Sequence, residues 1–135
     1  MYQLRDWRSR LHAYLAENAD RKFQPGVFDC SLFSADCVKV ITGEDPAADY
    51  RGKYTTVAQG LALLQADGYA DHEDFVAKNF TETSRFYANA GYLAVVDQRG
   101  QKGVGVVLGS SIAVVTLGRG IGHVPLSSAR RAFIV

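Results

Sequence analysis

The sequence predicts a single α+β domain, residues 1–135, in which a mainly helical half precedes an antiparallel sheet. Three observations lead to this prediction. Hydrophobic residues make up 47% of the 135 residues and charged residues 21%, which is enough apolar material for a core. Apolar residues recur at helical spacing over residues 1–90, and short β-branched runs fill residues 91–135. Helices followed by a meander indicate helices packed on one side of a curled sheet.

Four helices are expected. The first covers residues 3–18 and is ended by the segment 24–26, which contains a Pro-Gly pair. The second begins with Asp29 as its N-cap and ends before Gly43, because glycine readily adopts the left-handed conformation that stops a helix. The third starts at Thr55 or Thr56, and a fourth, weaker helix starts near Asp71. The apolar stripe of the third helix consists of Val57, Leu61 and Leu64.

The second half of the chain is expected to form five short strands. They are separated by Gly, Ser, Asn or charged residues at intervals of about ten residues, as in antiparallel hairpins. The β-branched runs are Tyr92–Val96, Val104–Leu108, Ile112–Thr116, Gly122–Leu126 and Ala132–Val135.

The charge pattern excludes several classes of partner. The net charge of +1 provides no basic surface for nucleic acid. The first residues are too charged for a signal peptide and no apolar run reaches membrane-spanning length, so we expect synthesis in the cytoplasm and no membrane insertion.

Acids prevail between Glu44 and Glu82, and the residues after Asp97 carry only bases, which we expect to pair with those acids. These bases are Arg99, Lys102, Arg119, Arg130 and Arg131.

Cys30 is the main candidate for chemistry. At the first position of a helix, the macrodipole and free N–H groups stabilise a thiolate and can hold an oxyanion. The alternative is that Cys30 only packs, as free cysteines commonly do, and Cys37 in the middle of the helix is expected to be a core residue. Seven residues on one helix place the two cysteines about 10.5 Å apart, beyond disulfide reach. We expect no metal or cofactor, since no histidine has zinc-site spacing to the cysteines.

A thiol hydrolase also needs a base, and the sequence offers three histidines. His12 is expected to flank the apolar stripe of the first helix. His72 lies in an acidic run, Asp71–Asp74, which is typical of a solvated helix N-terminus. His123 lies in a predicted strand and could be the base if that strand lines a cleft above Cys30.

Two further segments have alternative interpretations. Gly103–Gly109 looks like a glycine-rich nucleotide loop, but its spacing is wrong and its glycines lie within a predicted strand. The segment Tyr50–Tyr54 could be a contact surface. We favour a rigid connector in which Tyr54 packs against the core and Arg51 binds backbone carbonyls.

The segment Pro25–Phe33, followed by a helical middle and five strands, resembles the NlpC-type cell-wall peptidases, compact relatives of the papain fold. In that family an Asp-Cys-Ser-Gly-Phe motif puts the nucleophile at a helix N-terminus, which corresponds to Cys30. Gly91–Val95 is similar to the Gly-Asp-Leu-Val strand of the family, and Gly103–Gly109 to its His-Val-Gly-Ile-Tyr-Leu-Gly strand. The resemblance implies a papain-like NlpC-type fold with a five-stranded antiparallel sheet.

A second resemblance, to small proteins encoded among phage tail genes, covers nearly the whole chain. The matching segments are Thr42–Ala48, Tyr50–Tyr54, Val124–Leu126 and Ala132–Phe133. It implies a virion component near the tail-tip hub, whose partners are other tail proteins and whose further ligand could be a peptidoglycan peptide.

The catalytic part of the family pattern is incomplete. The family histidine falls on Gly103, its third polar residue falls near Val114 or Val115, Tyr92 replaces an aspartate and Leu32 replaces the motif glycine. The resemblance therefore implies a degenerate enzyme that keeps its shape.

The alternative is an active thiol hydrolase that cuts peptidoglycan peptides. In this hypothesis Cys30 is the nucleophile, His123 is a relocated base and Asp97 orients that base.

Overall fold

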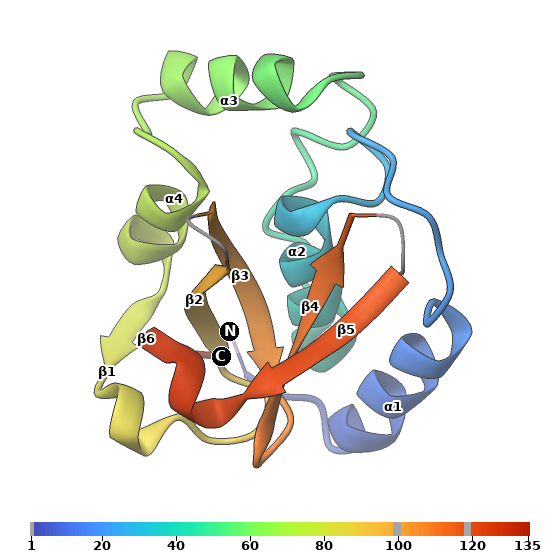
Figure 1. Cartoon of the computed structure of the whole chain (residues 1–135), viewed down its shortest axis with the longest axis vertical. Coiled ribbons are helices and arrows are strands. Elements are labelled where there is room, and N and C mark those ends of the chain that lie inside the picture. Colours follow the sequence, from blue (N-terminus) through green and yellow to red (C-terminus); the bar gives the residue numbers. More distant parts are fainter. Residues whose placement is uncertain (1, 99–100, 118–119) are drawn as a thin grey trace.

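The computed structural model describes residues 2–98, 101–117 and 120–135, and these residues form an α+β fold (Figure 1). Within them, four helices precede most of a six-stranded antiparallel sheet with the strand order β1-β6-β2-β3-β4-β5. The helices are α1 (Trp7–Glu17), α2 (Cys30–Thr42), α3 (Val57–Ala66) and α4 (His72–Asn79). The strands are β1 (Thr81–Thr83), β2 (Leu93–Gln98), β3 (Gln101–Val107), β4 (Ser111–Thr116), β5 (Gly120–Pro125) and β6 (Ala129–Ile134). None of the described helices is long and apolar enough to cross a membrane.

The prediction of a five-stranded sheet is wrong by one strand. Strands β2 to β6 lie where the β-branched runs indicated, but β1 pairs with β6 at one edge, with Glu82 opposite Phe133. β1 consists of three polar residues, none of them buried, so it has no apolar alternation that a sequence could show. β1 forms only because it pairs with β6, the C-terminal strand, which is distant in the sequence.

The core lies mainly between α2 and one face of the sheet. Phe28, Phe33 and Phe133 are fully buried there, and Phe28 meets Phe33 edge-on with ring centroids 6.2 Å apart. Cys37 is also fully buried, which confirms it as a core residue, and both cysteines are free. The opposite face of the curled sheet buries a second, smaller cluster. Its fully or nearly fully buried members are Ala94, Val96, Val107, Ile112, Val114 and Ala129.

The predicted helix boundaries hold best where a cap defines them. Asp29 caps α2 by accepting the Leu32 N–H at 2.8 Å, and Gly43 ends the helix in the left-handed conformation. α1 begins at Trp7 rather than near residue 3, because the preceding segment is held by a backbone hydrogen bond from Leu4 N–H to the Ile41 carbonyl (2.8 Å).

α3 has no buried residue, although its apolar stripe was visible in the sequence. Thr56 caps it, and its apolar side chains Val57 and Leu61 remain 62% and 40% exposed. Figure 1 shows α3 at one end of the molecule, away from the sheet. A Cβ on Gly60 would lie 2.9 Å from the Tyr54 ring, so the glycine lets this helix approach that ring closely.

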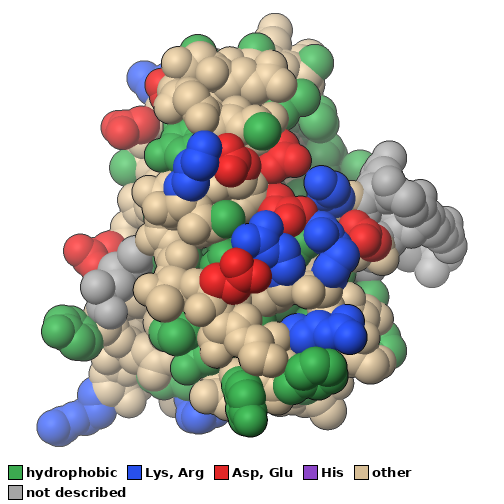
Figure 2. Space-filling model, turned by 90° about the vertical axis from the view of Figure 1, so that its left-hand side faces the viewer, with side chains coloured by type: hydrophobic (Ala, Val, Ile, Leu, Met, Phe, Trp, Pro, Cys, Tyr) green, Lys and Arg blue, Asp and Glu red, His purple; other side chains and the backbone are tan. Residues whose placement is uncertain are grey.

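Charged side chains gather on one face of the molecule (Figure 2), where α4 meets the sheet. Glu73 of α4 accepts hydrogen bonds from Arg130 (2.6 Å) and Arg131 (2.7 Å), and Arg131 also binds Glu82 (2.8 Å). The predicted pairing between the acidic middle and the basic C-terminal part is therefore confirmed for these residues. Arg99 and Arg119, which belonged to the same prediction, lie outside the described residues.

Candidate functional site

A cleft of about 1380 Å³ opens beside the N-terminus of α2 and is lined by residues of α2, α3, α4, β2, β3 and β4. Its volume exceeds that of ordinary small-ligand pockets, which reach about 1,000 Å³. Cys30 and Ser34 of α2 line it together with His72 of α4 and Gly103 of β3. The predicted nucleophile therefore lies in a large cleft, but the residues around it differ from those expected.

The segment before Cys30 is shaped by the carboxylate of Asp29, which is 5% exposed. One oxygen accepts the Leu32 N–H (2.8 Å), and the other accepts the Gly26 N–H (3.0 Å) and the Tyr54 hydroxyl. Gly26 has φ +83°, and a Cβ there would lie 2.0 Å from the Tyr54 carbonyl oxygen, so only glycine fits. These contacts fix the position of Cys30 at the N-terminus of α2.

The Tyr50–Tyr54 segment supports this arrangement as a connector. Tyr50 and Tyr54 pack against a buried cluster formed by Leu32 and Ala35 of α2 and by Ala47. Arg51 binds two carboxylates, Asp36 (2.6 Å) and Asp45 (2.7 Å), so the predicted bonds to backbone carbonyls are replaced by ion pairs. The segment is thus anchored to the core, as predicted for a connector.

The expectation of a stabilised thiolate at Cys30 is wrong. Burial raises the pKa of the Cys30 thiol, and the neighbouring Asp29 carboxylate raises it further. A backbone N–H at the helix terminus lowers the pKa, but its effect is the smallest of the three. Because the capping residue is itself an anion, it offsets the helix dipole, and Cys30 stays a protonated thiol at neutral pH.

His72 is the residue that the sequence analysis placed wrongly. It lines the cleft and is partly buried, with its ring stacked on Phe75 at a centroid distance of 6.3 Å. Asp71 caps α4 and so holds His72 at the first helical position. The acidic run indicated a solvated turn, and no local signal showed that His72 reaches Ser34 of α2.

A hydrogen-bond chain fixes the tautomer of His72. Ser34 Oγ donates its single hydrogen to the Ser31 carbonyl (2.8 Å), so its contact with His72 Nε2 (2.9 Å) requires a proton on Nε2. Burial lowers the pKa of His72 to about 4, although Asp29 and Asp71 oppose the shift. The ring is therefore neutral at pH 7, and its Nδ1 is left as a hydrogen-bond acceptor. His72 makes no contribution to the raised pKa of Cys30.

The neutral state of His72 should make stability depend on pH in a defined window. The pKa is about 4 in the folded protein and 6.5 when unperturbed, so the unfolded chain binds the proton first. The contribution is complete above pH 6.5, and stability should fall as the pH drops from 6.5 to 4, by at most about 1.4 kcal/mol per pH unit. Urea unfolding at several pH values measures this slope. In His72→Gln, which keeps a donor for Ser34, the slope above about pH 5 should disappear, whereas carboxylates with lowered pKa values, such as Glu73 and Glu82, still contribute at lower pH. An unchanged slope above about pH 5 would assign it to other groups.

The other candidate residues are not brought to Cys30. His123 is exposed on the edge strand β5, opposite Ala113, and does not line the cleft formed by the described residues. The condition for its role as base is therefore not met. Asp97 is exposed on β2 and lies 3.1 Å from Arg130 Nε, so its partner is an arginine and not a histidine.

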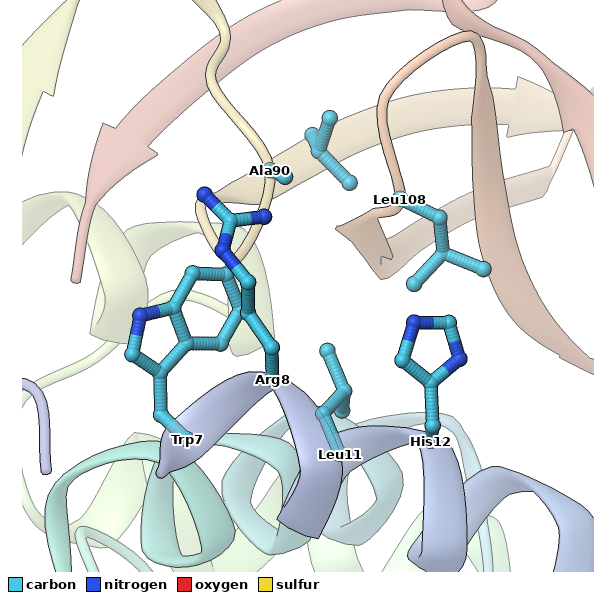
Figure 3. A pocket seen from close by; sticks show the side chains of 7 residues that line it. Trp7, Arg8, Leu11, His12, Ala90 and Leu108 are labelled. Atoms are coloured by element: carbon cyan, nitrogen blue, oxygen red, sulfur yellow. The ribbon is translucent and has the colours of Figure 1, made fainter. Parts of the chain in front are cut away.

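His12 lies on α1 beside a small cavity of about 30 Å³ (Figure 3). The Arg8 guanidinium lies 4.4 Å from the centroid of the Trp7 ring, and Leu108 closes the other side. The cavity has room for about one water molecule. It offers no ligand site.

Gly103 occupies the position that the NlpC-type resemblance assigns to the histidine. It lines the cleft, and a Cβ there would meet only Val96 Cγ2, at 4.0 Å. The backbone could thus carry a side chain at this point, and the sequence supplies none.

Comparison with known proteins gives one match. No curated protein matches the sequence. A family described as a domain of unknown function, DUF6950, matches residues 2–135. The match covers almost the entire sequence, and the chain belongs to the DUF6950 family.

Proposed function

We propose that this protein is a structural component of a phage tail tip, with an NlpC-type papain-like fold that has lost its catalysis. The sequence resemblances to NlpC-type peptidases and to phage tail-cluster proteins motivate the proposal. The helix-first α+β order, with a cysteine at the N-terminus of the helix packed on an antiparallel sheet, supports it. In this role the protein resides in the virion tail and binds other tail-tip or hub proteins.

One observation carries the loss of catalysis. Cys30 has the family position, yet burial and Asp29 raise its pKa, and no imidazole among the described residues forms a hydrogen bond with its sulfur. A thiol without a proton-transfer partner is a poor nucleophile and cannot protonate a leaving amine. General acid–base assistance is worth roughly 10²–10⁴-fold in rate, so its loss removes useful peptidase activity.

The reactivity of Cys30 tests this part of the proposal. We expect iodoacetamide to alkylate Cys30 at pH 7.5 more slowly than it alkylates free cysteine, because the pKa of the thiol is raised and the thiolate reacts. Mass spectrometry over a pH series measures the rate. Cys37 is fully buried, so a Cys30→Ala variant should remain unlabelled while folded. Rapid labelling near neutral pH, with peptidoglycan cleavage that Cys30→Ala abolishes, would show an active enzyme.

The structural role is tested by binding. Purified tail-hub proteins should be retained by the immobilised full chain, and equally by its Cys30→Ala variant, because the role does not use the thiol. Absence of binding to any hub or tail-tip protein would contradict the role. Binding that depends on the Cys30 thiol would point to chemistry at this site.

A second candidate function is an active thiol hydrolase in which His72, rather than His123, is the base. The observation that favours it is that Cys30 and His72 line one cleft, with Ser34 orienting the ring and leaving Nδ1 free to accept a proton. Peptidoglycan cleavage that is lost in His72→Ala and kept in His123→Ala would support this function. Cleavage in neither the native protein nor the variants would reject it.

A further inference from the structure

The cleft beside Cys30 has apolar walls that nothing in the described chain covers. On one side α3 presents Val57, Leu61 and Leu64, the first two of which are 62% and 40% exposed. The cleft is also lined by Val115 of β4 and by Leu117, which is 71% exposed. Because exposed apolar side chains in a cleft favour an apolar occupant, the cleft should bind hydrophobic groups.

The charged groups of the cleft are already paired, which limits the charge of an occupant. Asp29 accepts hydrogen bonds from Gly26, Leu32 and Tyr54, and Glu73 from two arginines. Lys102 lies 3.9 Å from Asp71 and 3.8 Å from Glu73.

Among the described residues, the charged side chains that line the cleft are Asp29, Asp71, Glu73 and Lys102. Beside Asp29 and Glu73, whose carboxylates already accept short hydrogen bonds, a charged ligand group would lose hydration without gaining an ion pair. The charge pattern therefore favours an uncharged occupant.

Polar side chains at the cleft can still form hydrogen bonds. His72 Nδ1 is an acceptor, because Nε2 carries the proton that binds Ser34. The Cys30 thiol is a weak donor at the N-terminus of α2, and the hydroxyl of the neighbouring Ser31, which also lines the cleft, is a second donor. An acceptor next to donors matches a peptide group, which offers one N–H and one C=O.

We propose that this cleft holds an extended, uncharged, apolar segment of a partner protein without covalent chemistry, and that His72 Nδ1 accepts a main-chain N–H of that segment. This inference rests on the proposed structural role and specifies the chemistry of its partner. The volume of about 1380 Å³ is larger than a small molecule needs and suits several consecutive residues. The occupant differs from a peptidoglycan peptide, which carries free carboxylates.

The test is a selection of random peptides displayed on a carrier against the immobilised full chain. We expect the enriched peptides to be uncharged and rich in Val, Leu and Phe. For the best synthetic peptide, with both ends blocked, Leu61→Asp should weaken binding by about tenfold or more, because a charge then faces the apolar occupant. Ala62→Asp is the matched control: its exposed neighbouring site does not line the cleft, so affinity should stay within about twofold.

A second variant, at a cleft residue outside α3, shows whether a loss of binding is caused only by misfolding of α3. Leu117→Asp should weaken the same peptide by a similar factor, and the urea midpoint of each variant shows that it is folded. The inference is overturned if no peptide is enriched, if the enriched peptides are charged, or if Leu61→Asp binds as well as Ala62→Asp. Competition by a soluble muropeptide would also overturn it.

The failure of this inference and the failure of the proposed function give different results. Loss of peptide binding in Leu61→Asp without loss of tail-hub binding would show that the hub docks elsewhere, which overturns the inference and keeps the structural role. Absence of hub binding by the native chain would contradict the role, whereas the peptide selection would still decide what the cleft accepts.

Discussion

Replacing Gly105 with alanine should lower the free energy of unfolding by about 3 kcal/mol, the upper part of the usual cost of overpacking a core. Gly105 is buried on β3, opposite Ala94 of β2. A Cβ there would lie 2.4 Å from the Ala113 carbonyl oxygen and 2.6 Å from Ile112 Cγ2. Because the nearest atom belongs to the backbone of β4, relief requires β3 and β4 to move apart.

Gly103→Ala is the matched control for this experiment. It lies two residues earlier on the same strand, faces the same side of the sheet, and its Cβ would meet only Val96 Cγ2 at 4.0 Å. We expect its stability to equal or slightly exceed that of the native protein, since alanine loses less backbone entropy on folding. Urea unfolding of both variants measures the difference. Equal destabilisation would show that β3 and β4 are not packed as closely as described.

Asp29→Ala should be the most damaging change at the site, with a loss of about 3 kcal/mol. It removes the cap of α2 and leaves the N–H groups of Leu32 and Gly26 and the Tyr54 hydroxyl without their acceptor. Loss of the hydrogen bond from the Tyr54 hydroxyl should also loosen the connector Tyr50–Tyr54, which precedes α3 and packs against Leu32. Thermal or urea unfolding should show the loss, and a change below about 0.5 kcal/mol would contradict it.

Asp29→Asn removes the charge of this residue and keeps its cap of α2, while the Gly26 N–H and the Tyr54 hydroxyl lose their acceptor oxygen. The amide oxygen can still accept the Leu32 N–H, so most of the helix cap is retained. The carboxylate raises the pKa of Cys30, so removing its charge should lower that pKa and speed alkylation at pH 8 relative to the native protein. An unchanged rate would mean that burial alone keeps the thiol protonated.

The sequence was informative about the fold wherever a local rule decides the structure. Asp29 and Gly43 were correct as the two ends of α2, because capping and the left-handed stop depend on one residue each. β1 could not be predicted, since its three polar residues become a strand only by pairing with β6, about fifty residues later. α1 was predicted to start too early, because the tie between Leu4 and Ile41 is a long-range contact.

The candidate site shows the same division. Cys30 at a helix N-terminus followed from the local pattern, and the structure places it in a large cleft. The raised pKa of Cys30 could not be predicted, because the sequence does not show how deeply Asp29 and Cys30 are buried. His72 was assigned to a solvated turn, and only the tertiary position of α4, which contacts β3, brings it to Ser34. Conversely, a role of His123 as the base required β5 to lie over the cleft. The strand order instead places β5 at the edge of the sheet.

The absence of any fully buried side chain on α3 has a consequence for how such a protein can evolve. Substitutions on this helix change one wall of the cleft, yet they remove little packing from the core and so cost little stability. Selection can therefore alter the binding preference by mutating α3 while α2 and the sheet stay constant. Within a lineage, recognition would diversify at this helix faster than the scaffold that supports it.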